Sequence, residues 1–236
     1  MMRCKIVYED AEILVIHKPA GLATQSASVG QADAVSELKK YLSKNGKAPY
    51  LGIVHRLDQP VEGLLVFAKT PKAASVLSKS LGGESLNKRY YAAVCGKPVA
   101  EKGELVDLLV KDGNVARIVT GQEGMAEAKT AKLSYHVLRS ATAGDAAGET
   151  FGETQISLLE VQIETGRFHQ IRAQLSHAGF PILADLKYGN EASKEIASKL
   201  GLRTVALAAY SIELLHPVTK KRLSFKYEPE FVGLFG

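Results

Sequence analysis

Residues 51–70 read LGIVHRLDQPVEGLLVFAKT, and the second half of this stretch is typical of a buried β-strand because its apolar run is almost unbroken. Just before that run, His55, Arg56 and Asp58 place an imidazole, a guanidinium and a carboxylate within four residues. One interpretation is a solvated turn that carries a chance cluster of charges. The other is that Asp58 is a working carboxylate and that the basic residues belong to its substrate site.

The segments on either side predict a chain dominated by short strands. We expect strands at residues 5–10, 13–18, 63–69, 87–96, 129–139, 155–163, 204–215 and 221–227, and a hairpin over 104–120 that turns at residues 111–114. Residues 140–153 are small and polar and predict a loop.

Three helices are predicted between these strands. Residues 33–44 are amphipathic, and Asn45-Gly46 would stop that helix; Thr70-Pro71 would cap a second helix that Gly82-Gly83 ends. Residues 166–179 predict a third helix with Ile171, Leu175 and Ala178 on its buried face. Strands neighbour by hairpins more often than by helical crossovers, which favours an α+β fold with a mixed, mostly antiparallel central sheet flanked by helices and loops.

Composition bounds the class of protein. The chain has 236 residues, 46% of them hydrophobic and 23% charged, as in ordinary globular proteins. No apolar run approaches the ~20 residues of a membrane-spanning helix, and the N-terminus lacks the apolar region of a signal peptide. Cys4 and Cys95 form neither a disulfide framework nor a metal cluster, so we expect a cytoplasmic protein with free thiols. The net charge of +5 is compatible with a polyanionic partner such as nucleic acid.

A second segment rich in reactive side chains runs from Glu164 to Arg172. On the predicted helix, His169 and Arg172 would share one face, away from Ile171. Arg172 would then point into water or pair with a carboxylate from elsewhere in the fold. If that carboxylate were Asp58, the pair would keep Asp58 ionised and would suit a nucleophile or base. A purely structural salt bridge is the alternative.

Several motifs together resemble the RluA-type family of RNA pseudouridine synthases. They are YEDAEILVIHKPAGL, HRLDQPVEGLLVFAKT, KRYYAAVCG, TGRFHQIRAQLSHAGFPI followed by D and YG, and ALAAYSIELLHPVTKK. The resemblance covers about residues 6–228. It implies a single pseudouridine synthase catalytic domain over residues 1–236, and we expect no separate S4-like RNA-binding module.

The resemblance also implies roles for individual residues. Asp58 matches the family's catalytic aspartate, Arg172 the arginine that pairs with it, and Tyr90 the active-site tyrosine that stacks on the base. Arg56 matches the arginine that fills the space left by the flipped-out base. His55, Arg167 and His169 complete the candidate substrate-binding set, with His55 as scaffold of the same loop. The implied reaction converts uridine to pseudouridine in ribosomal or transfer RNA and needs no cofactor and no metal; we expect a monomer.

The chain departs from the common family pattern at a few positions. Gln59 replaces a frequent Arg, Glu62 a frequent Ser or Thr, and Phe168 a usual Thr. These departures affect the expected substrate more than the expected reaction. Glu62 adds a negative charge near a site for a polyanion, with a nearby lysine as one conceivable partner.

Three alternatives stay open at this point. The first is a non-catalytic RNA-binding protein on the same fold, which would not need Asp58, Tyr90 and Arg172 together. The second is a glycoside hydrolase, which requires two carboxylates; Glu62 or Glu164 would be the second, but the chain has no Trp for a sugar platform. The third is metal-dependent hydrolysis, which the spacing of the histidines does not support.

Overall fold

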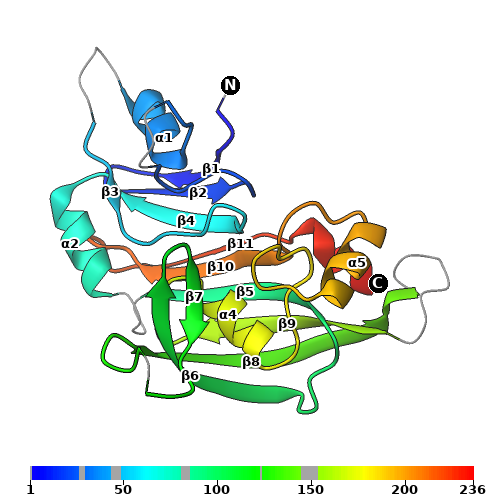
Figure 1. Ribbon diagram of the computed structural model, residues 1–236. Coiled ribbons are helices and arrows are strands. Elements are labelled where there is room, and N and C mark those ends of the chain that lie inside the picture. Colours follow the sequence, from blue (N-terminus) through cyan, green and yellow to red (C-terminus); the bar gives the residue numbers. More distant parts are fainter. Residues whose placement is uncertain (1, 27–29, 44–48, 81–85, 123, 145–153) are drawn as a thin grey trace. The chain divides into compact units, whose positions relative to one another are not determined.

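The computed structural model describes residues 2–26, 30–43, 49–80, 86–122, 124–144 and 154–236 (Figure 1). These residues divide into two compact units. The first comprises Met1–Lys88 and Ala209–Tyr227, and the second comprises Arg89–Ala208 and Glu228–Gly236. The single domain over residues 1–236 stays a prediction.

The first unit is built on the strand that follows Asp58. This strand, β4 (Glu62–Ala68), is buried at every residue after Glu62, as its continuous apolar run predicts. The antiparallel strands β1 (Lys5–Glu9) and β2 (Ile13–Lys18) lie on one side of it, and the short β3 (Gly52–Ile53) pairs with its end. Next to β4 in the strand order comes β10 (Leu207–Leu215), which pairs with β11 (Arg222–Lys226).

Both helices predicted for this unit are confirmed. Helix α1 (Ala34–Leu42) begins after Asp33, whose side chain accepts a hydrogen bond from the Ser36 backbone N–H. Helix α2 (Pro71–Lys79) begins after Thr70 in the same way. The glycine signals that would end these helices lie outside the described residues.

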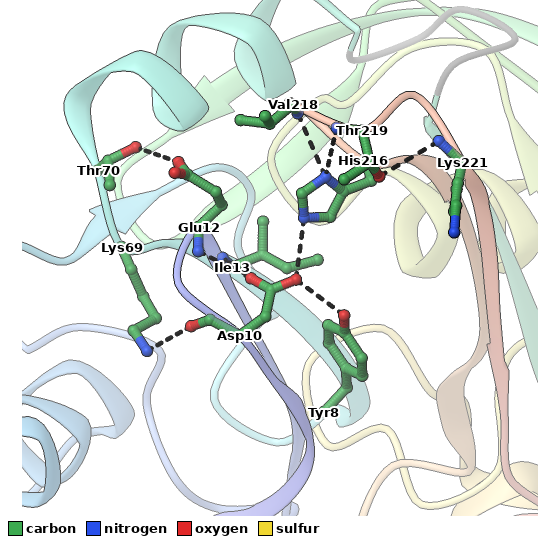
Figure 2. Close-up of polar contacts among 10 residues, drawn as sticks. All are labelled: Tyr8, Asp10, Glu12, Ile13, Lys69, Thr70, His216, Val218, Thr219 and Lys221. Carbon is green, nitrogen blue, oxygen red and sulfur yellow. Dashed lines mark hydrogen bonds and ion pairs between the residues drawn. The ribbon is translucent and has the colours of Figure 1, made fainter.

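A partly buried polar contact joins the end of β10 to the turn between β1 and β2 (Figure 2). The Asp10 carboxylate accepts hydrogen bonds from four groups: Glu12 N, Ile13 N, Tyr8 Oη and His216 Nε2. The His216 imidazole in turn accepts two backbone N–H groups at Nδ1, from the turn that follows it. With Nδ1 engaged by these two backbone N–H groups, Nε2 is the ring nitrogen that faces Asp10.

The second unit holds an antiparallel sheet in the order β5-β9-β8-β6-β7. Its strands are β5 (Leu86–Cys95, with its first three residues in the first unit), β6 (Lys102–Asp112), β7 (Val115–Ile118), β8 (Lys129–Thr142) and β9 (Gln155–Ile163). The predicted β6–β7 hairpin is confirmed. Asp112 pairs with Val115, and Gly113 turns the chain at φ +55°, where a residue without Cβ is favoured.

Part of the loop predicted over residues 140–153 is strand instead. Strand β8 continues to Thr142, which pairs with Gln155 at the start of β9. Pairing with β9 therefore overrides the weak strand propensity of these small polar residues. Residues 145–153 lie outside the described part of the chain.

The helices of the second unit are α4 (Gln170–His177), α5 (Glu191–Lys199) and the 3₁₀-helix η1 (Glu230–Phe235); the last two were not predicted. Helix α4 begins four residues later than predicted because His169 adopts a left-handed conformation, φ +50°. His169 is therefore the N-cap residue, just outside the helix, although its side chain and that of Arg172 both contact Tyr188. Ile171 and Leu175 are buried as predicted, and Ala178 is the half-buried C-cap residue.

The α+β class is confirmed. The pairs β1–β2, β2–β4, β5–β9 and β8–β9 are all antiparallel. Both cysteines are free and buried. Burial raises the pKa of the Cys4 thiol to about 12. Over the described ranges, no helix is both long enough and apolar enough to cross a membrane.

Candidate active site

In the first unit, Asp58 lies in the loop that leads into β4, and the backbone just before it is clamped by Thr24. The Thr24 hydroxyl donates to the Leu57 carbonyl at 2.8 Å and accepts from the Leu57 N–H at 3.1 Å. Both residues are buried. The Asp58 carbonyl then accepts from the Val61 N–H at 3.1 Å and closes the turn. The half-buried carboxylate of Asp58 is thus carried on a backbone with little freedom to move.

A buried lysine holds the other side of the same loop. Lys18 is 0% exposed, and its ammonium donates to the carbonyls of Leu22 at 2.6 Å, Pro19 at 3.1 Å and Gln59 at 3.3 Å. Burial lowers the pKa of Lys18 to about 8, while the charges of Asp58 and Glu62 oppose that shift. The loop that carries Asp58 therefore closes over a cation.

Gln59, which departs from the family pattern, also takes part in holding the loop. Its side-chain amide donates to the Gly21 carbonyl at 3.2 Å, and its own carbonyl accepts from the Gly21 N–H at 2.9 Å. The departure therefore has a local structural explanation that the sequence did not supply.

His55 and Arg56 have opposite environments. His55 is buried, and its Nε2 accepts from the Val66 backbone N–H in β4 at 3.2 Å. Burial, together with the charge of Lys88, holds the pKa of His55 well below its usual range, so the ring is neutral. Arg56 is exposed and donates to the Gln25 side chain at 3.0 Å. His55 thus braces the loop against β4, whereas Arg56 is accessible from solvent.

Glu62 begins β4 and faces His17 across the β2–β4 pair. Its carboxylate lies 3.7 Å from His17 Nε2. The His17 ring meets Tyr227 edge-on, with ring centroids 4.5 Å apart. Burial, followed by the charge of Glu62, raises the pKa of the Tyr227 hydroxyl. The lysine partner considered from the sequence is present only as the electrostatic influence of Glu62 on Lys18; the side-chain contact is with His17.

In the second unit, Arg172 forms a buried ion pair with Asp185. The Arg172 Nε and Nη2 atoms each lie 2.7 Å from one Asp185 oxygen, which is a bidentate arrangement. The side chains are 3% and 0% exposed. The Tyr188 ring covers the guanidinium, whose Cζ lies 5.0 Å from the ring centroid. The orientation of Arg172 is therefore fixed within its own unit.

The backbone around Asp185 has an unusual conformation that serves this pair. Ala184 has φ +58°, a left-handed conformation that costs free energy for a residue with a Cβ. The Asp185 carboxylate also accepts from the backbone N–H groups of Lys187 and Tyr188. Gly189 donates to the Asp185 carbonyl at 2.7 Å, and a Cβ at Gly189 would lie only 2.4 Å from that oxygen. The segment therefore requires a glycine at this position.

The other predicted residues of the second unit are held by the sheet and by the segment before α4. Tyr90 is 5% exposed and pairs with Val161 in β9. Arg167 is exposed, and its Nε donates to the Thr130 carbonyl at 2.9 Å. His169 is buried, with Nδ1 2.8 Å from the Tyr188 hydroxyl.

The predicted site residues thus divide between the two units: His55, Arg56 and Asp58 in the first, and Tyr90, Arg167, His169 and Arg172 in the second. That Asp58 pairs with Arg172 stays a prediction. Sequence reasoning missed Asp185, Lys18 and Thr24 as supporting residues. Asp185 stood within a quoted motif, but nothing in the sequence identified it as the partner of Arg172.

The described residues contain no cluster of three or more His, Cys, Asp or Glu side chains arranged to bind a metal ion. The ionisable side chains described above are instead held by hydrogen bonds and ion pairs. The first unit thus offers a carboxylate and a guanidinium, and the second unit offers a phenol and guanidinium groups.

A family model described as RNA pseudouridylate synthase matches residues 12–177, well over half of the chain. The chain belongs to this family. The RluA-type resemblance seen in the motifs is confirmed, and the matched range contains Asp58, Tyr90 and Arg172. Members of the RNA pseudouridylate synthase family are RNA-modifying isomerases.

Curated relatives carry the same activity in their names. An uncharacterized RNA pseudouridine synthase of Bacillus subtilis is 33% identical over 215 residues, which are 91% of this chain and 65% of the relative. Ribosomal large subunit pseudouridine synthase D of Pseudomonas aeruginosa is 34% identical over 231 residues, which are 94% of this chain and 67% of the relative. The tRNA pseudouridine synthase C of Haemophilus ducreyi is 28% identical over 94% of this chain and 90% of its own length. The chain thus spans about two thirds of the length of the first two relatives.

Solved structures agree on the fold. Human RNA Pseudouridylate Synthase Domain Containing 4 matches with a TM-score of 0.71 at 26% identity, over 98% of this chain and 91% of its own. Human RNA Pseudouridylate Synthase Domain Containing 1 gives a TM-score of 0.75 over 98% of this chain and 85% of its own. Its identity is 20%, so it supports the fold alone.

Proposed function

We propose that this protein isomerises specific uridines to pseudouridine in ribosomal or transfer RNA. The observation that carries the proposal is that the family match spans the positions of all three expected catalytic residues, Asp58, Tyr90 and Arg172. The names of the relatives support both RNA classes, since some act on the large ribosomal subunit and one acts on tRNA.

In the proposed mechanism, the Asp58 carboxylate attacks the target nucleotide, and the uracil detaches, rotates and rejoins through C5. Arg172 would keep that carboxylate ionised, and Tyr90 would stack on the base and assist proton removal from C5. Such a reaction consumes no redox equivalent and transfers no external group. One carboxylate, one proton acceptor and a closed pocket are therefore sufficient.

The target base must first leave its stack, which costs a few kcal/mol. We propose that Arg56 takes the vacated space. Its exposed guanidinium and its contact with Gln25 are compatible with this role. Arg167 and His169 would contact the RNA, and His55 would support the loop that carries Asp58.

Two structural features favour catalysis over a purely binding role. The loop of Asp58 is held by Thr24 and by the buried Lys18. Arg172 is buried in a bidentate pair whose desolvation is costly. A protein that only bound RNA would have little use for so much buried charge around these positions.

Tritium release tests the proposal directly. Ribosomal and transfer RNA transcripts carrying tritium at C5 of uridine would be incubated with wild type, with Asp58→Asn and with the control Glu195→Gln, which removes an exposed carboxylate on α5. We expect release by wild type and by the control, no release by Asp58→Asn, and similar RNA binding by all three.

The responding RNA pool would identify the substrate class. Binding without release from either pool would support the non-catalytic alternative. Release by Asp58→Asn would refute the role assigned to this carboxylate.

A further inference from the structure

Phe168 is a large apolar side chain that remains 40% exposed in the second unit. It stands where the family pattern has a smaller polar residue. Its ring stacks on His169, with centroids 3.8 Å apart and planes 20° apart. The Lys111 ammonium lies over the ring, 5.1 Å from its centroid. An exposed aromatic ring can stack on a planar group, and a cation beside it can bind negative charge on the same ligand.

The ring rests on a rigid base. His169 Nδ1 is 2.8 Å from the Tyr188 hydroxyl, and the His169 and Tyr188 rings meet edge-on at 5.6 Å. The Tyr188 hydroxyl also accepts from the Ala116 backbone N–H at 2.6 Å. Tyr188 in turn covers the Arg172 guanidinium. Binding of a ligand to Phe168 would therefore cost the protein little conformational freedom, which favours affinity.

Two basic side chains accompany this ring, Lys111 of β6 and Arg167. Arg167 precedes Phe168, and its guanidinium is anchored through Nε to the Thr130 carbonyl of β8 at 2.9 Å. Lys111 and Arg167 are both exposed. The nearest exposed carboxylates along the chain are Asp112, which follows Lys111, and Glu164, three positions before Arg167.

We propose that Phe168 is a stacking platform for an unpaired base of the RNA substrate, with Lys111 and Arg167 contacting the flanking phosphates. This inference rests on the proposed function, because it assumes an RNA substrate. Base–aromatic stacking tolerates every base, so the platform would help to choose unpaired over paired RNA. On binding, the Lys111 ammonium would move from the ring to a phosphate while the anchored Arg167 fixes the backbone.

Measuring how variants bind an unstructured oligouridine separates the contribution of stacking to affinity from the contribution of charge. We expect Phe168→Leu, which keeps an apolar side chain without a π face, to weaken binding about 5- to 150-fold, and Phe168→Tyr to bind like wild type. Phe168→Leu should leave the salt dependence of binding unchanged. Lys111→Ala should reduce the slope of log Kobs against log salt by about 0.7. Thermal unfolding of each variant would verify that it is folded.

Fluorescence gives a second readout, because the chain has no Trp. Phe168→Trp places a single tryptophan on the platform, whose emission can be excited apart from that of the tyrosines, and oligouridine should quench it by stacking. Inorganic polyphosphate, which carries charge but no bases, should not. Tyr41→Trp, at an exposed tyrosine of the first unit, is the matched control and should respond to neither.

Wild-type affinity in Phe168→Leu, no quenching of Phe168→Trp at saturating oligouridine, or no oligouridine binding by wild type would each overturn the platform. If wild type releases tritium but Phe168→Leu binds like wild type, only this inference fails. If oligouridine quenches Phe168→Trp but wild type releases no tritium from any RNA, the proposed function fails and the platform stands.

Discussion

Thr24 and Leu57 exchange two hydrogen bonds in the first unit, through one hydroxyl that both donates to and accepts from the same backbone residue. Leu57 immediately precedes Asp58. The conformation of the catalytic candidate is therefore tied to a side chain 34 positions away, since Thr24 and Leu57 are 33 residues apart and Asp58 follows. A threonine with no chemistry of its own becomes a positioning residue.

Thr24→Val should uncouple this contact. The variant keeps the shape of the side chain but leaves the buried N–H and C=O of Leu57 unpaired, so we expect a loss of about 1–3 kcal/mol in the free energy of unfolding. Turnover should fall more than RNA affinity. Urea unfolding and tritium release measure the two effects. Thr24→Ser, which retains the hydroxyl, should restore most of both; equal stability of Thr24→Val and wild type would contradict the role.

The Arg172–Asp185 pair predicts a large effect from a small change. Asp185→Asn removes the charge that holds the buried Arg172 guanidinium in its bidentate pair, which should cost about 3–5 kcal/mol of stability. The exposed pair of Lys194 and Glu191 provides a control, because removing Glu191 should cause no measurable loss. Urea unfolding of the two variants would compare them directly. A similarly small loss of stability in both variants would show that burial does not determine how much the Arg172–Asp185 pair contributes to stability.

Lys18 should make stability rise with pH. Its pKa is about 8 in the folded protein and 10.5 as a free side chain, so between these values the unfolded chain binds more protons. The cost of burying the cation is fully present below pH 8 and disappears as the pH approaches 10.5. It corresponds to about 3 kcal/mol.

Urea unfolding of wild type and Lys18→Met across that window measures the effect. The stability of wild type relative to Lys18→Met should increase with pH. A constant difference would mean that Lys18 keeps an ordinary pKa.

The buried His55 should lower the stability of the protein at acidic pH. Its folded pKa lies well below 6.5, so the unfolded chain binds a proton that the folded protein excludes as the pH falls through 6.5. Wild type should lose up to about 1.4 kcal/mol per pH unit below that point relative to His55→Gln. Unfolding measurements on both sides of pH 6.5 provide the comparison. Parallel pH profiles would show that His55 is free to ionise.

The architecture was largely readable from local patterns. The buried run of β4, the cap at Thr70 and the hairpin turn at Gly113 all depend on neighbours in the chain. Where tertiary contacts decide, local patterns failed. Thr142 is strand because β9 lies beside it, and α4 starts late because His169 is held in a left-handed conformation.

In the candidate site, too, local patterns predicted one part and tertiary contacts decided the other. The sequence motifs identified the residues that could act, but not the residues that hold them. Asp185 reaches Arg172 only because the backbone turns through the unfavourable φ of Ala184. In the sequence, Lys18 looks like an ordinary surface lysine. Only the structure shows that it is 0% exposed. Such long-range pairings follow from the fold and leave no periodic pattern.

The bond between Asp10 and His216 spans 206 positions, and its consequence concerns the order of synthesis. The hairpin of β10 and β11 that His216 belongs to emerges from the ribosome after residues 89–208, the main part of the second unit, have been made. The first unit therefore begins before the second but is completed only after the main part of the second has been made. Until β10 arrives, the apolar strand β4 has an open edge, which exposes the nascent chain to mispairing and makes it a substrate for chaperones.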